Sequence, residues 1–472
     1  MFVGRENEFE ILDRCMASDR SEFVIVYGRR RVGKTCLVDH YFKKRYDFSY
    51  VGGHRLTKSE QLASFAKALK KYARLRERPV FKEWIDAFDA LEEYLESIPG
   101  EGRKVIFIDE MPWIDTPASS FVSALENFWN GWAARRDDIV FVASGSATSW
   151  MVDKLVDNPG GLHGRITTNI YLRPFNLREV EEYLKRRGCK WDRYQILQTY
   201  MTLGGVPYYL SLLDVKSSLV QNIDHLFFEK NAPLRMEFRE LYDALFAGSE
   251  KYVSVVKLLS AHRDGLIRDE IISGTGMEGS QLTIILKNLE RCDFIIKFNQ
   301  FGNKKKGALY RVVDFYTLFY YKFVENDAAM DEHWWQHNFS SHSVEAWEGL
   351  SFELVCLTHL SQIKNALQIG GIATQANSWR QSGADGGRGA QIDLVISRAD
   401  RMINLCEMKF SRKPFVITSE YEDKLRSRLT LFEEGTKTNF GLLNTFITVF
   451  GVKDGLHSSI VDSEITSDDL FR

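Results

Sequence analysis

The chain has 472 residues, which at about 100–200 residues per domain predicts roughly three domains. Hydrophobic residues make up 44% of the sequence and aromatic residues 13%, which excludes an intrinsically disordered chain. The 62 Lys and Arg residues against 64 Asp and Glu residues leave a net charge of −2, which excludes a globally basic nucleic-acid binder but allows a local basic face.

The N-terminal segment carries charged residues from Arg5 onward, so it is not expected to be a signal peptide. No uncharged apolar run reaches the roughly 18 residues that a membrane span needs. The 6 cysteines are scattered, without a CxxC pair that would indicate zinc or a redox site. These features predict a cytoplasmic protein with reduced thiols and no membrane contact.

In residues 1–175, short apolar runs alternate with segments of helical spacing. The runs at 23–27, 104–110, 138–146 and 168–172 are expected to be strands. Continuous apolar strands between helices predict an α/β fold with a parallel sheet covered on both faces. Polar and acidic residues follow several of these runs, at the carboxyl edge of the sheet, where such folds bind ligands.

Beyond residue 175 the pattern changes. Residues 176–248 have helical spacing, broken at Gly204-Gly205 and Pro207, and predict a helical lid. Residues 249–325 contain three helical segments and a hairpin with Lys304–Lys306 at its tip, which predicts a winged helix-turn-helix. The lysines suit a DNA-phosphate contact and a solvated tip equally well. Residues 326–472 are α/β again, with a polar glycine-rich loop at 382–389.

A complete GxxxxGK[ST] motif follows the first predicted strand and precedes a helical segment, which is the context of a phosphate-binding loop. Its glycines let backbone N–H groups surround phosphate oxygens, and the helix N-terminus adds its dipole. Lys34 is expected to reach the β- and γ-phosphates, and the Thr35 hydroxyl to coordinate Mg²⁺. The arginine side chains of the loop are expected to point outward. The predicted nucleotide-binding residues here are Gly28, Arg29, Arg30, Arg31, Val32, Gly33, Lys34, Thr35 and Cys36.

Catalytic candidates follow the later strands. Asp109 is expected to hold Mg²⁺, directly or through water, and Glu110 to polarise the attacking water, which predicts hydrolysis rather than binding alone. The alternative is a solvated acidic pair. Ser146 is expected near the γ-phosphate, unless it is only a small turn residue. Arg165 either neutralises transition-state charge or forms a surface salt bridge, and an oligomer is required if it acts on a neighbouring copy.

A second candidate site lies near the C-terminus. Asp393, Glu407 and Lys409 have a spacing that suits two neighbouring strands joined by a turn, and Glu407 and Lys409 would point to the same face. Asp393 and Glu407 would bind Mg²⁺ or a similar hard cation, and Lys409 would position or activate water. Glu348 or Glu353 could add a carboxylate. This arrangement is that of a PD-(D/E)XK nuclease. The alternative is a nuclease-like fold without cleavage.

Two further segments have simpler interpretations. His333 and His337 stand one helical turn apart without an HExxH pattern, so a packed aromatic segment is favoured over a metal site. The aromatic-rich segment 314–323 is expected to be core rather than a platform for stacking bases.

A series of motifs in residues 1–250 resembles the archaeal-type ATPase family, an AAA-like, STAND-related group of P-loop proteins. They are FVGRE at 2–6, the phosphate loop, IFIDEMPW at 106–113, ASGSATSWM at 143–151, GLHGR at 161–165 and GGVPYYL at 204–210. The resemblance implies ATP as the nucleotide and a helical lid after the sheet. It also implies that Val3, Gly4 and Arg5 contribute to the adenine pocket.

Residues 330–440 resemble the C-terminal domain of unknown function that follows the ATPase in many members, a domain likened to PD-(D/E)XK nucleases. No clear Pro-Asp pair stands at Asp393. The predicted domains are a P-loop ATPase core (1–175), a helical lid (176–248), a winged helix (249–325) and a nuclease-like domain (326–472). The main interpretation is an AAA-like ATPase coupled to a metal-dependent nuclease-like domain that acts on DNA. The alternative is a non-nucleolytic signalling switch whose C-terminal domain binds a partner.

Overall fold

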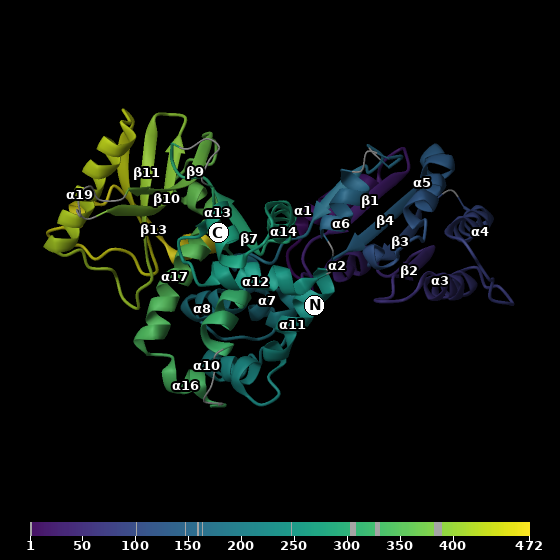
Figure 1. The fold of residues 1–472 in the computed structure, drawn as a ribbon, viewed down its shortest axis with the longest axis horizontal. Helices are drawn as coiled ribbons and strands as arrows, with labels where there is room; N and C mark the ends of the chain where they lie inside the picture. The colour runs from purple at the N-terminus through teal and green to yellow at the C-terminus, as the bar shows by residue number, and fades with distance from the viewer. Residues whose placement is uncertain are drawn as a thin grey trace. The chain divides into compact units, whose positions relative to one another are not determined.

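The computed structural model of the chain describes residues 2–100, 102–146, 148–157, 160–162, 164–246, 248–302, 308–325, 331–381 and 389–472. The chain forms two compact units, Met1–Pro174 and Phe175–Arg472 (Figure 1). The predicted boundaries at 248 and 325 fall inside the second unit. The predicted hairpin lysines at 304–306 and most of the glycine-rich loop at 382–389 lie outside the described residues.

The first unit is built on a 5-stranded parallel sheet in the order β2-β3-β4-β1-β5. The strands are β1 (Glu22–Tyr27), β2 (Phe48–Val51), β3 (Lys104–Asp109), β4 (Ile139–Gly145) and β5 (Thr168–Tyr171). The predicted α/β class with a parallel sheet is confirmed. Strand β2 was not predicted, because it has only 4 residues and its burial alternates instead of running continuously.

Helices cover both faces of this sheet. α1 (Glu6–Met16) and α2 (Lys34–Tyr41) pack on one face, in a cluster with Val24, Val26 and Val142. The other face packs against α3 (Lys58–Tyr72), α4 (Trp84–Ser97), α5 (Phe121–Gly131) and α6 (Thr148–Met151). Because both faces of the central strands are buried, their sequences are almost continuously apolar.

The turn after β1 requires glycine at position 28. Gly28 has a φ of +148°, and a Cβ there would lie 2.3 Å from the carbonyl oxygen of Leu172, just after β5. A side chain is therefore incompatible with the pairing of β1 and β5. Gly33 precedes α2 with a φ of 92°, which is also a glycine conformation. The close approach to Leu172 thus fixes the start of the phosphate-binding loop, and the left-handed conformation of Gly33 marks its end.

The second unit begins with helices α7 (Leu177–Arg186), α8 (Arg193–Leu203), α9 (Pro207–Ser211), α10 (Leu219–Ile223) and α11 (Pro233–Leu245). Asn176 starts α7 with a capping box, in which it and Glu179 each accept a backbone hydrogen bond of 2.9 Å from the other. At Gly205, between α8 and α9, a Cβ would lie 1.7 Å from the carbonyl oxygen of Phe175. This close approach explains the glycine of the GGVP motif.

Residues 249–312 form a segment that we call the helix–hairpin module. It contains α12 (Ser249–Ser260), β6 (Leu266–Ile267), α13 (Arg268–Thr275), α14 (Gly279–Arg291), β7 (Ile295–Phe298) and β8 (Leu309–Val312). Its strands pair antiparallel in the order β6-β8-β7. The aromatic α15 (Phe315–Phe319) follows, and Tyr316 and Phe319 are fully buried, as predicted for this segment.

The last part of the chain carries a 5-stranded sheet in the order β13-β12-β11-β10-β9. Its strands are β9 (Thr374–Gln381), β10 (Ala390–Arg398), β11 (Met402–Lys409), β12 (Gly441–Thr448) and β13 (Ser463–Thr466). β9, β10 and β11 pair antiparallel, and β11, β12 and β13 pair parallel. α17 (His342–Thr358) packs on one face and α19 (Ser419–Thr436) on the other.

α16 (Trp334–Asn338) precedes α17, and α18 (Leu360–Ala366) follows it. In α16 the rings of Trp334 and Trp335 pack on Phe323, in agreement with the predicted aromatic segment. His333 and His337 are exposed, and His337 Nδ1 lies 2.8 Å from an Asp331 oxygen.

Within the described ranges, no helix combines the length and the apolar character needed to cross a membrane.

His359, between α17 and α18, is a buried histidine that joins two helices. Its Nδ1 lies 2.9 Å from the Val355 carbonyl oxygen, and its Nε2 accepts a hydrogen bond of 3.2 Å from the Leu177 N–H. Nδ1 therefore carries the proton and the ring is neutral. Burial lowers the pKa of His359 to about 4 from an ordinary 6.5.

Because of this pKa, the second unit is expected to lose stability when the pH falls from about 6.5 to 4. In this range the unfolded histidine binds a proton that the folded one excludes. The loss amounts to about 3 kcal/mol, since one pKa unit corresponds to about 1.4 kcal/mol. Urea unfolding at pH 7.5 and pH 5 measures the part of this loss that falls above pH 5, about 2 kcal/mol. The variant His359→Gln keeps a donor and an acceptor, and its stability should depend less on pH; an unchanged dependence would contradict this assignment.

Candidate nucleotide-binding site and the C-terminal carboxylates

The carboxyl ends of three neighbouring strands meet at one edge of the first sheet. β4 pairs with both β1 and β3, so the loop after β1, the acidic end of β3 and Ser146 after β4 lie side by side. The structure brings together Lys34, Thr35, Asp109, Glu110 and Ser146 at this edge. This is the location that the order of the predicted strands indicates for a ligand.

Lys34 lies at the centre of this group and is only 5% exposed. Its Nζ donates hydrogen bonds to the carbonyl oxygens of Gly28 and Arg29, at 3.1 and 3.0 Å, and to Ser146 Oγ at 3.2 Å. The ammonium group is thus held inside the curve of the loop by neutral acceptors. A phosphate oxygen is a stronger acceptor for the ammonium group than a carbonyl oxygen, because its negative charge adds a direct attraction between opposite charges.

Asp109 faces the start of α2. Thr35 Oγ1 donates a 2.7 Å hydrogen bond to Asp109 Oδ2, and the other carboxylate oxygen accepts from Ser144 Oγ and, at 3.0 Å, from the Glu110 N–H. A hydroxyl and a carboxylate oxygen side by side are the hard ligands that Mg²⁺ prefers, so these residues fit the ion. Ser144 was not predicted as part of the site; the only signal was its position near the end of β4, two residues before Ser146.

Ser146 connects Lys34 to Glu110. Its Oγ accepts from Lys34 and donates a 2.8 Å hydrogen bond to Glu110 Oε1, while its backbone N–H donates to Glu110 Oε2 at 3.3 Å. Glu110 has a φ of 49°, which turns the chain sharply after β3. Ser146 therefore does more than allow a turn: it holds the candidate catalytic carboxylate next to the loop lysine.

The N-terminal segment is fixed to the phosphate-binding loop by Arg5. This buried side chain donates to the carbonyl oxygens of Val32, at 3.4 Å, and Arg173, at 2.8 Å. Val3 is buried as well, and Gly4 has a φ of 65°. The segment thus joins the loop to the chain that follows β5. The part of Val3, Gly4 and Arg5 in an adenine pocket stays a prediction.

We predicted that the loop arginines point outward. This prediction is wrong for Arg29, whose side chain is 2% exposed. Arg30 and Arg31 are half-buried, and Cys36 is exposed.

Arg165 is exposed, and in the part of the chain that the structure describes its side chain has no hydrogen bond or ion pair to the loop. Its role in neutralising transition-state charge stays a prediction.

In the C-terminal sheet, Glu407 is already neutralised. Its carboxylate accepts from Tyr421 and Arg428 of α19, and Lys409 Nζ lies 2.8 Å from Oε1. Burial alone would raise the pKa of Glu407, but the Arg428 and Lys409 charges lower it to about 2. Glu407 and Lys409 do share a face, as predicted. Two cations and a hydroxyl occupy the carboxylate, which does not suit a further metal ion.

Asp393 has different partners. Its Oδ1 accepts a 2.9 Å hydrogen bond from Gln391 Nε2, and its Oδ2 lies 3.8 Å from an Arg263 nitrogen. Arg263 also donates to Glu353, at 2.6 and 2.7 Å. Burial raises the pKa of Glu353, and Asp393 adds to the rise. Asp393 is thus associated with Glu353, whereas Glu348 is bound by Gln198 at 2.6 Å.

A β-bulge explains why the alternation of side chains fails here. The pairing of β10 with β9 shifts by one residue between Ile392 and Val395. Ile392 and Val395 both pack in the cluster that contains Phe432 of α19, while Leu394 packs on the opposite side with Cys406. Regular alternation would place Ile392 and Leu394 on one face.

The structure therefore does not assemble Asp393 and Glu407 into one cation site. The two carboxylates share no hydrogen-bonding or ion-pairing partner among the described residues. Within the same residues there is no group of three or more His, Cys, Asp or Glu side chains that could hold a metal ion. The residues as placed do not fit the predicted divalent cation.

Comparison with known proteins finds similarity that is clearest in the first part of the chain. Residues 2–213 match the model of an ATPase domain predominantly from Archaea. The uncharacterized protein MJECL04 of Methanocaldococcus jannaschii is 24% identical over 417 residues, which cover 87% of this chain and 88% of that protein. The uncharacterized ATP-binding protein MJ0423 of the same organism is 42% identical over 45 residues, or 10% of this chain and 76% of that protein.

Solved structures of similar proteins include the Walker-type ATPase PABY2304 of Pyrococcus abyssi, with 16% identity and a TM-score of 0.48 over 68% of this chain and 96% of that one. The ORC2 protein of Aeropyrum pernix has 15% identity and a TM-score of 0.41 over 67% and 92%. Residues 2–213 are thus similar to an ATPase domain found predominantly in Archaea, and they contain the complete phosphate-binding loop motif.

Proposed function

We propose that the chain hydrolyses ATP with Mg²⁺ and that the ATP cycle controls its C-terminal domain. The observation that carries the hydrolytic part is the chain of contacts from Lys34 through Ser146 to Glu110. A carboxylate beside the loop lysine is a candidate group to orient and deprotonate the attacking water. Here the carboxylate belongs to Glu110, which directly follows Asp109. Asp109 accepts a hydrogen bond from Thr35, and we assign these two residues to the metal.

The arrangement supports a division of labour among these residues. Lys34 exchanges the carbonyl oxygens of Gly28 and Arg29 for phosphate oxygens when ATP enters the loop. Thr35 and Asp109 would hold Mg²⁺, which would supply positive charge to neutralise the phosphate oxygens. Ser146 loses Lys34 as a donor and is free to reorient, which releases Glu110 to accept a proton from water. The site thus couples phosphate binding to the position of the catalytic carboxylate.

ATP turnover by the purified chain is therefore expected to require a divalent cation. Addition of excess EDTA should reduce phosphate release to background, and added Mg²⁺ should restore it, because Thr35 and Asp109 are assigned to hold the cation that neutralises the phosphates. Steady-state phosphate release measures both steps. Turnover that persists in EDTA would contradict the assignment of Thr35 and Asp109.

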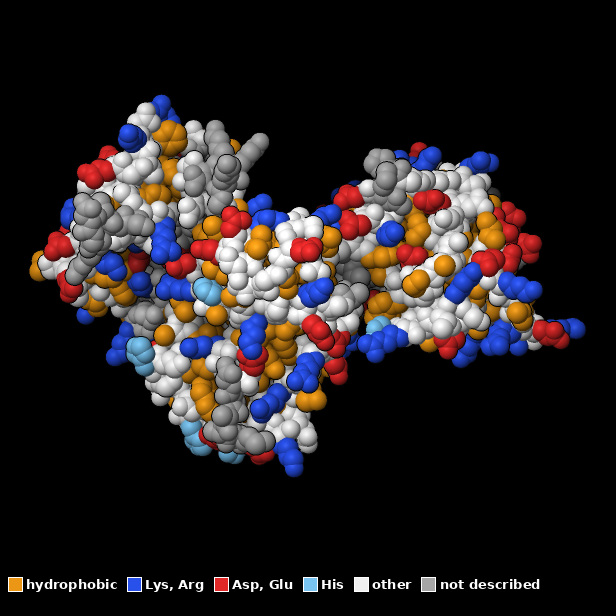
Figure 2. All heavy atoms as spheres, in the orientation of Figure 1, with side chains coloured by type: hydrophobic (Ala, Val, Ile, Leu, Met, Phe, Trp, Pro, Cys, Tyr) orange, Lys and Arg blue, Asp and Glu red, His pale blue; other side chains and the backbone are white. Residues whose placement is uncertain are grey.

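Cleavage of DNA is the second candidate function. The observation in its favour is that Asp393 and Glu353 lie against the same arginine, as two carboxylates near a cation would. On the face in Figure 2, however, basic and acidic side chains are intermingled. Nicking of plasmid DNA in the presence of Mn²⁺, abolished in Asp393→Ala, tests this candidate. Intact plasmid under all conditions favours the non-nucleolytic switch.

A further inference from the structure

Charge is separated by sign over α3, α4 and the loop between them, at one end of the first unit. Residues 67–78 contain six basic side chains and one acidic one, Glu77. All six are exposed or half-buried, and we call them the basic strip: Lys67, Lys70, Lys71, Arg74, Arg76 and Arg78. α4 has no basic residue, and its acids, which we call the acidic face, are Asp86, Asp89, Glu92, Glu93 and Glu96.

The basic strip and the acidic face adjoin on the surface, because α3 and α4 pack side by side. The ring centroid of Phe65 in α3 lies 5.5 Å from that of Trp84 and 6.1 Å from that of Phe88, both in α4. With these rings turned inward, the charged sides of both helices face outward. Figure 2 shows acidic side chains gathered over α4, at the right-hand end, and basic ones below them.

These charges are not neutralised within the chain. Lys58, at the start of α3, pairs with Glu83, just before α4, but both lie outside the two patches. Among the residues that the structure describes, no side chain of the basic strip forms a hydrogen bond or an ion pair. Burial, together with the negative charges of Asp89 and Glu96, raises the pKa of Glu92 to about 7. Like charges thus stand together on each helix, which by itself destabilises a helix.

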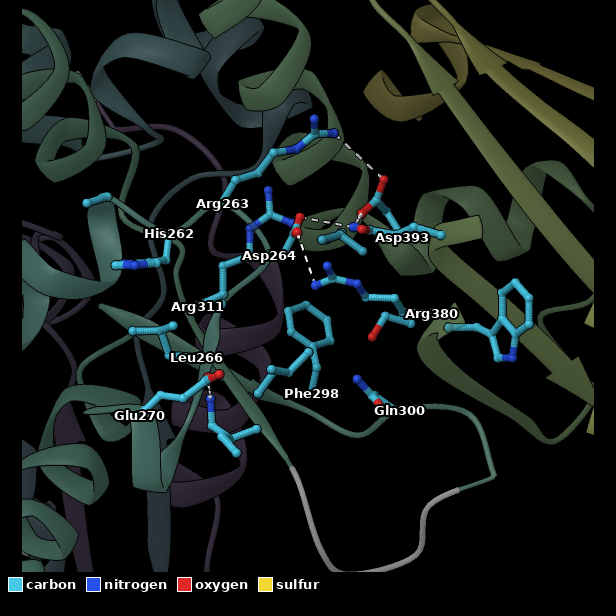
Figure 3. Close-up of a pocket in the computed structure, with 18 residues that line it drawn as sticks. His262, Arg263, Asp264, Leu266, Glu270, Phe298, Gln300, Arg311, Arg380 and Asp393 are labelled. Atoms are coloured by element: carbon cyan, nitrogen blue, oxygen red, sulfur yellow. Dashed lines mark hydrogen bonds and ion pairs between the residues drawn. The ribbon is translucent and has the colours of Figure 1, made fainter. Parts of the chain in front are cut away.

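A pocket of the second unit shows the contrasting case, in which opposite charges are paired inside the fold (Figure 3). There an Arg263 nitrogen lies 3.8 Å from Asp393 Oδ2, and an Arg380 nitrogen lies 3.6 Å from Asp264 Oδ2. Between the basic strip and the acidic face, the described part of the chain has no such ion pair. The charges of both patches are therefore open to a partner.

Exposed apolar side chains lie in the connection between the two patches. Val80 is 87% exposed and Leu75 41%, both in the loop, and Ile85 in the first turn of α4 is 39% exposed. Apolar side chains bordered by charged ones are typical of a surface that contacts another protein. The loop therefore adds apolar area to a surface that the charges already distinguish.

The occupant of this surface has to match both signs. A nucleic acid or an anionic membrane would be attracted by the basic strip but repelled by the acidic face beside it. A second copy of the chain carries both signs in the required arrangement, because a twofold dimer brings the same surface of each copy together. An axis along the boundary between the patches places each basic strip on the acidic face of the other copy.

We propose that the chain forms a twofold dimer through α3, α4 and the loop that joins them. The basic strip of each copy contacts the acidic face of the other, and the apolar loop residues are covered in the same contact. The opposite charges select the partner and its orientation. The inference goes beyond the proposed function and does not depend on ATP hydrolysis, since its residues lie outside the nucleotide-binding edge of the sheet.

Sedimentation velocity of the full chain without nucleotide tests the proposal. The wild-type chain is expected to dimerise at low ionic strength. Its dissociation constant should rise at least tenfold between about 0.05 and 0.5 M NaCl, because added salt screens the charges over shorter distances. A wild-type chain that remains monomeric at about 0.1 mM in low salt would overturn the proposal.

Two charge-reversed variants identify the surface. Lys67→Glu with Lys71→Glu makes the strip more acidic, and Asp89→Lys with Glu93→Lys makes the acidic face more basic. Each variant alone should dimerise at least about 100-fold more weakly than wild type, because like charges then face each other. An equimolar mixture of the two should dimerise again, since opposite charges meet at both contacts, and this recovery also shows that both variants fold. A mixture that stays monomeric while wild type dimerises would contradict the proposed contact.

Lys413→Glu with Lys453→Glu is the matched control. Both lysines are exposed in the second unit, so the variant makes the same change in net charge away from α3. It should dimerise like wild type, and an equal loss of dimer would mean that net charge alone determines association. A monomeric wild type that binds double-stranded DNA, with binding lost in Lys67→Glu with Lys71→Glu, would assign the basic strip to nucleic acid and overturn the dimer.

Discussion

Glu110→Gln is expected to lower ATP turnover by about 100-fold or more while ATP still binds. The amide keeps the shape of the carboxylate and can still contact Ser146, but it cannot accept a proton from water. Removing a group that acts only in the transition state lowers the turnover rate and leaves the affinity for ATP unchanged. Phosphate release at saturating ATP, together with a nucleotide-binding titration, measures the two effects separately.

Glu93→Gln is a suitable control for this experiment. Glu93 is exposed on α4 in the same unit, so the variant makes the same chemical change away from the sheet edge. Its turnover should equal that of wild type. If Glu110→Gln retains wild-type turnover, Glu110 is a structural acid held by Ser146, and another group must activate the water.

Lys34→Ala is expected to weaken ATP binding and to reduce turnover to background. Hydrogen bonds to charged groups contribute about 1.5–3 kcal/mol, so the loss of the phosphate contact should lower the affinity by about 10- to 100-fold. The substitution also removes the ammonium donor from the carbonyl oxygens of Gly28 and Arg29. Titration with a fluorescent ATP analogue measures the affinity.

Lys44→Ala provides the matched comparison for Lys34→Ala. Lys44 follows α2, is 76% exposed and lies 3.8 Å from an Asp39 oxygen. Its removal takes away the same charge without touching the loop, so affinity should be unchanged. Equal weakening in both variants would mean that the overall charge of this surface, and not the loop contact, determines ATP binding.

Much of the first site could be predicted because its residues follow strands at fixed positions. A glycine-rich turn after β1, an acidic pair ending β3 and a serine after β4 converge in any parallel sheet with this strand order. The burial of Arg29 could not be predicted, since the motif specifies the backbone and leaves the side chain open. Ser144 was missed because nothing in a buried apolar strand distinguishes a serine that binds Asp109 from a spacer.

The second site shows where sequence reasoning stops. Glu407 and Lys409 share a face because β11 is regular, and alternation predicts this correctly. Asp393 stands in a stretch with one extra residue, and no sequence signal marked that bulge. The contact of Arg263 with Glu353 joins positions 90 residues apart in the chain, and only tertiary docking creates it. Spacing therefore identified the charged residues, but the structure places Asp393 with Arg263 and Glu353, and Glu407 with Arg428 and Tyr421.

The most direct test of the central claim is a crystal structure of the chain with Mg²⁺ and a non-hydrolysable ATP analogue. The predicted result is a triphosphate in the loop at 28–35, with Lys34 Nζ moved from the Gly28 and Arg29 carbonyl oxygens onto phosphate oxygens. The same structure should place Mg²⁺ at Thr35 and Asp109, with Glu110 separated from Ser146. A bound triphosphate that leaves Lys34 on its carbonyl oxygens and Glu110 on Ser146 would contradict the account.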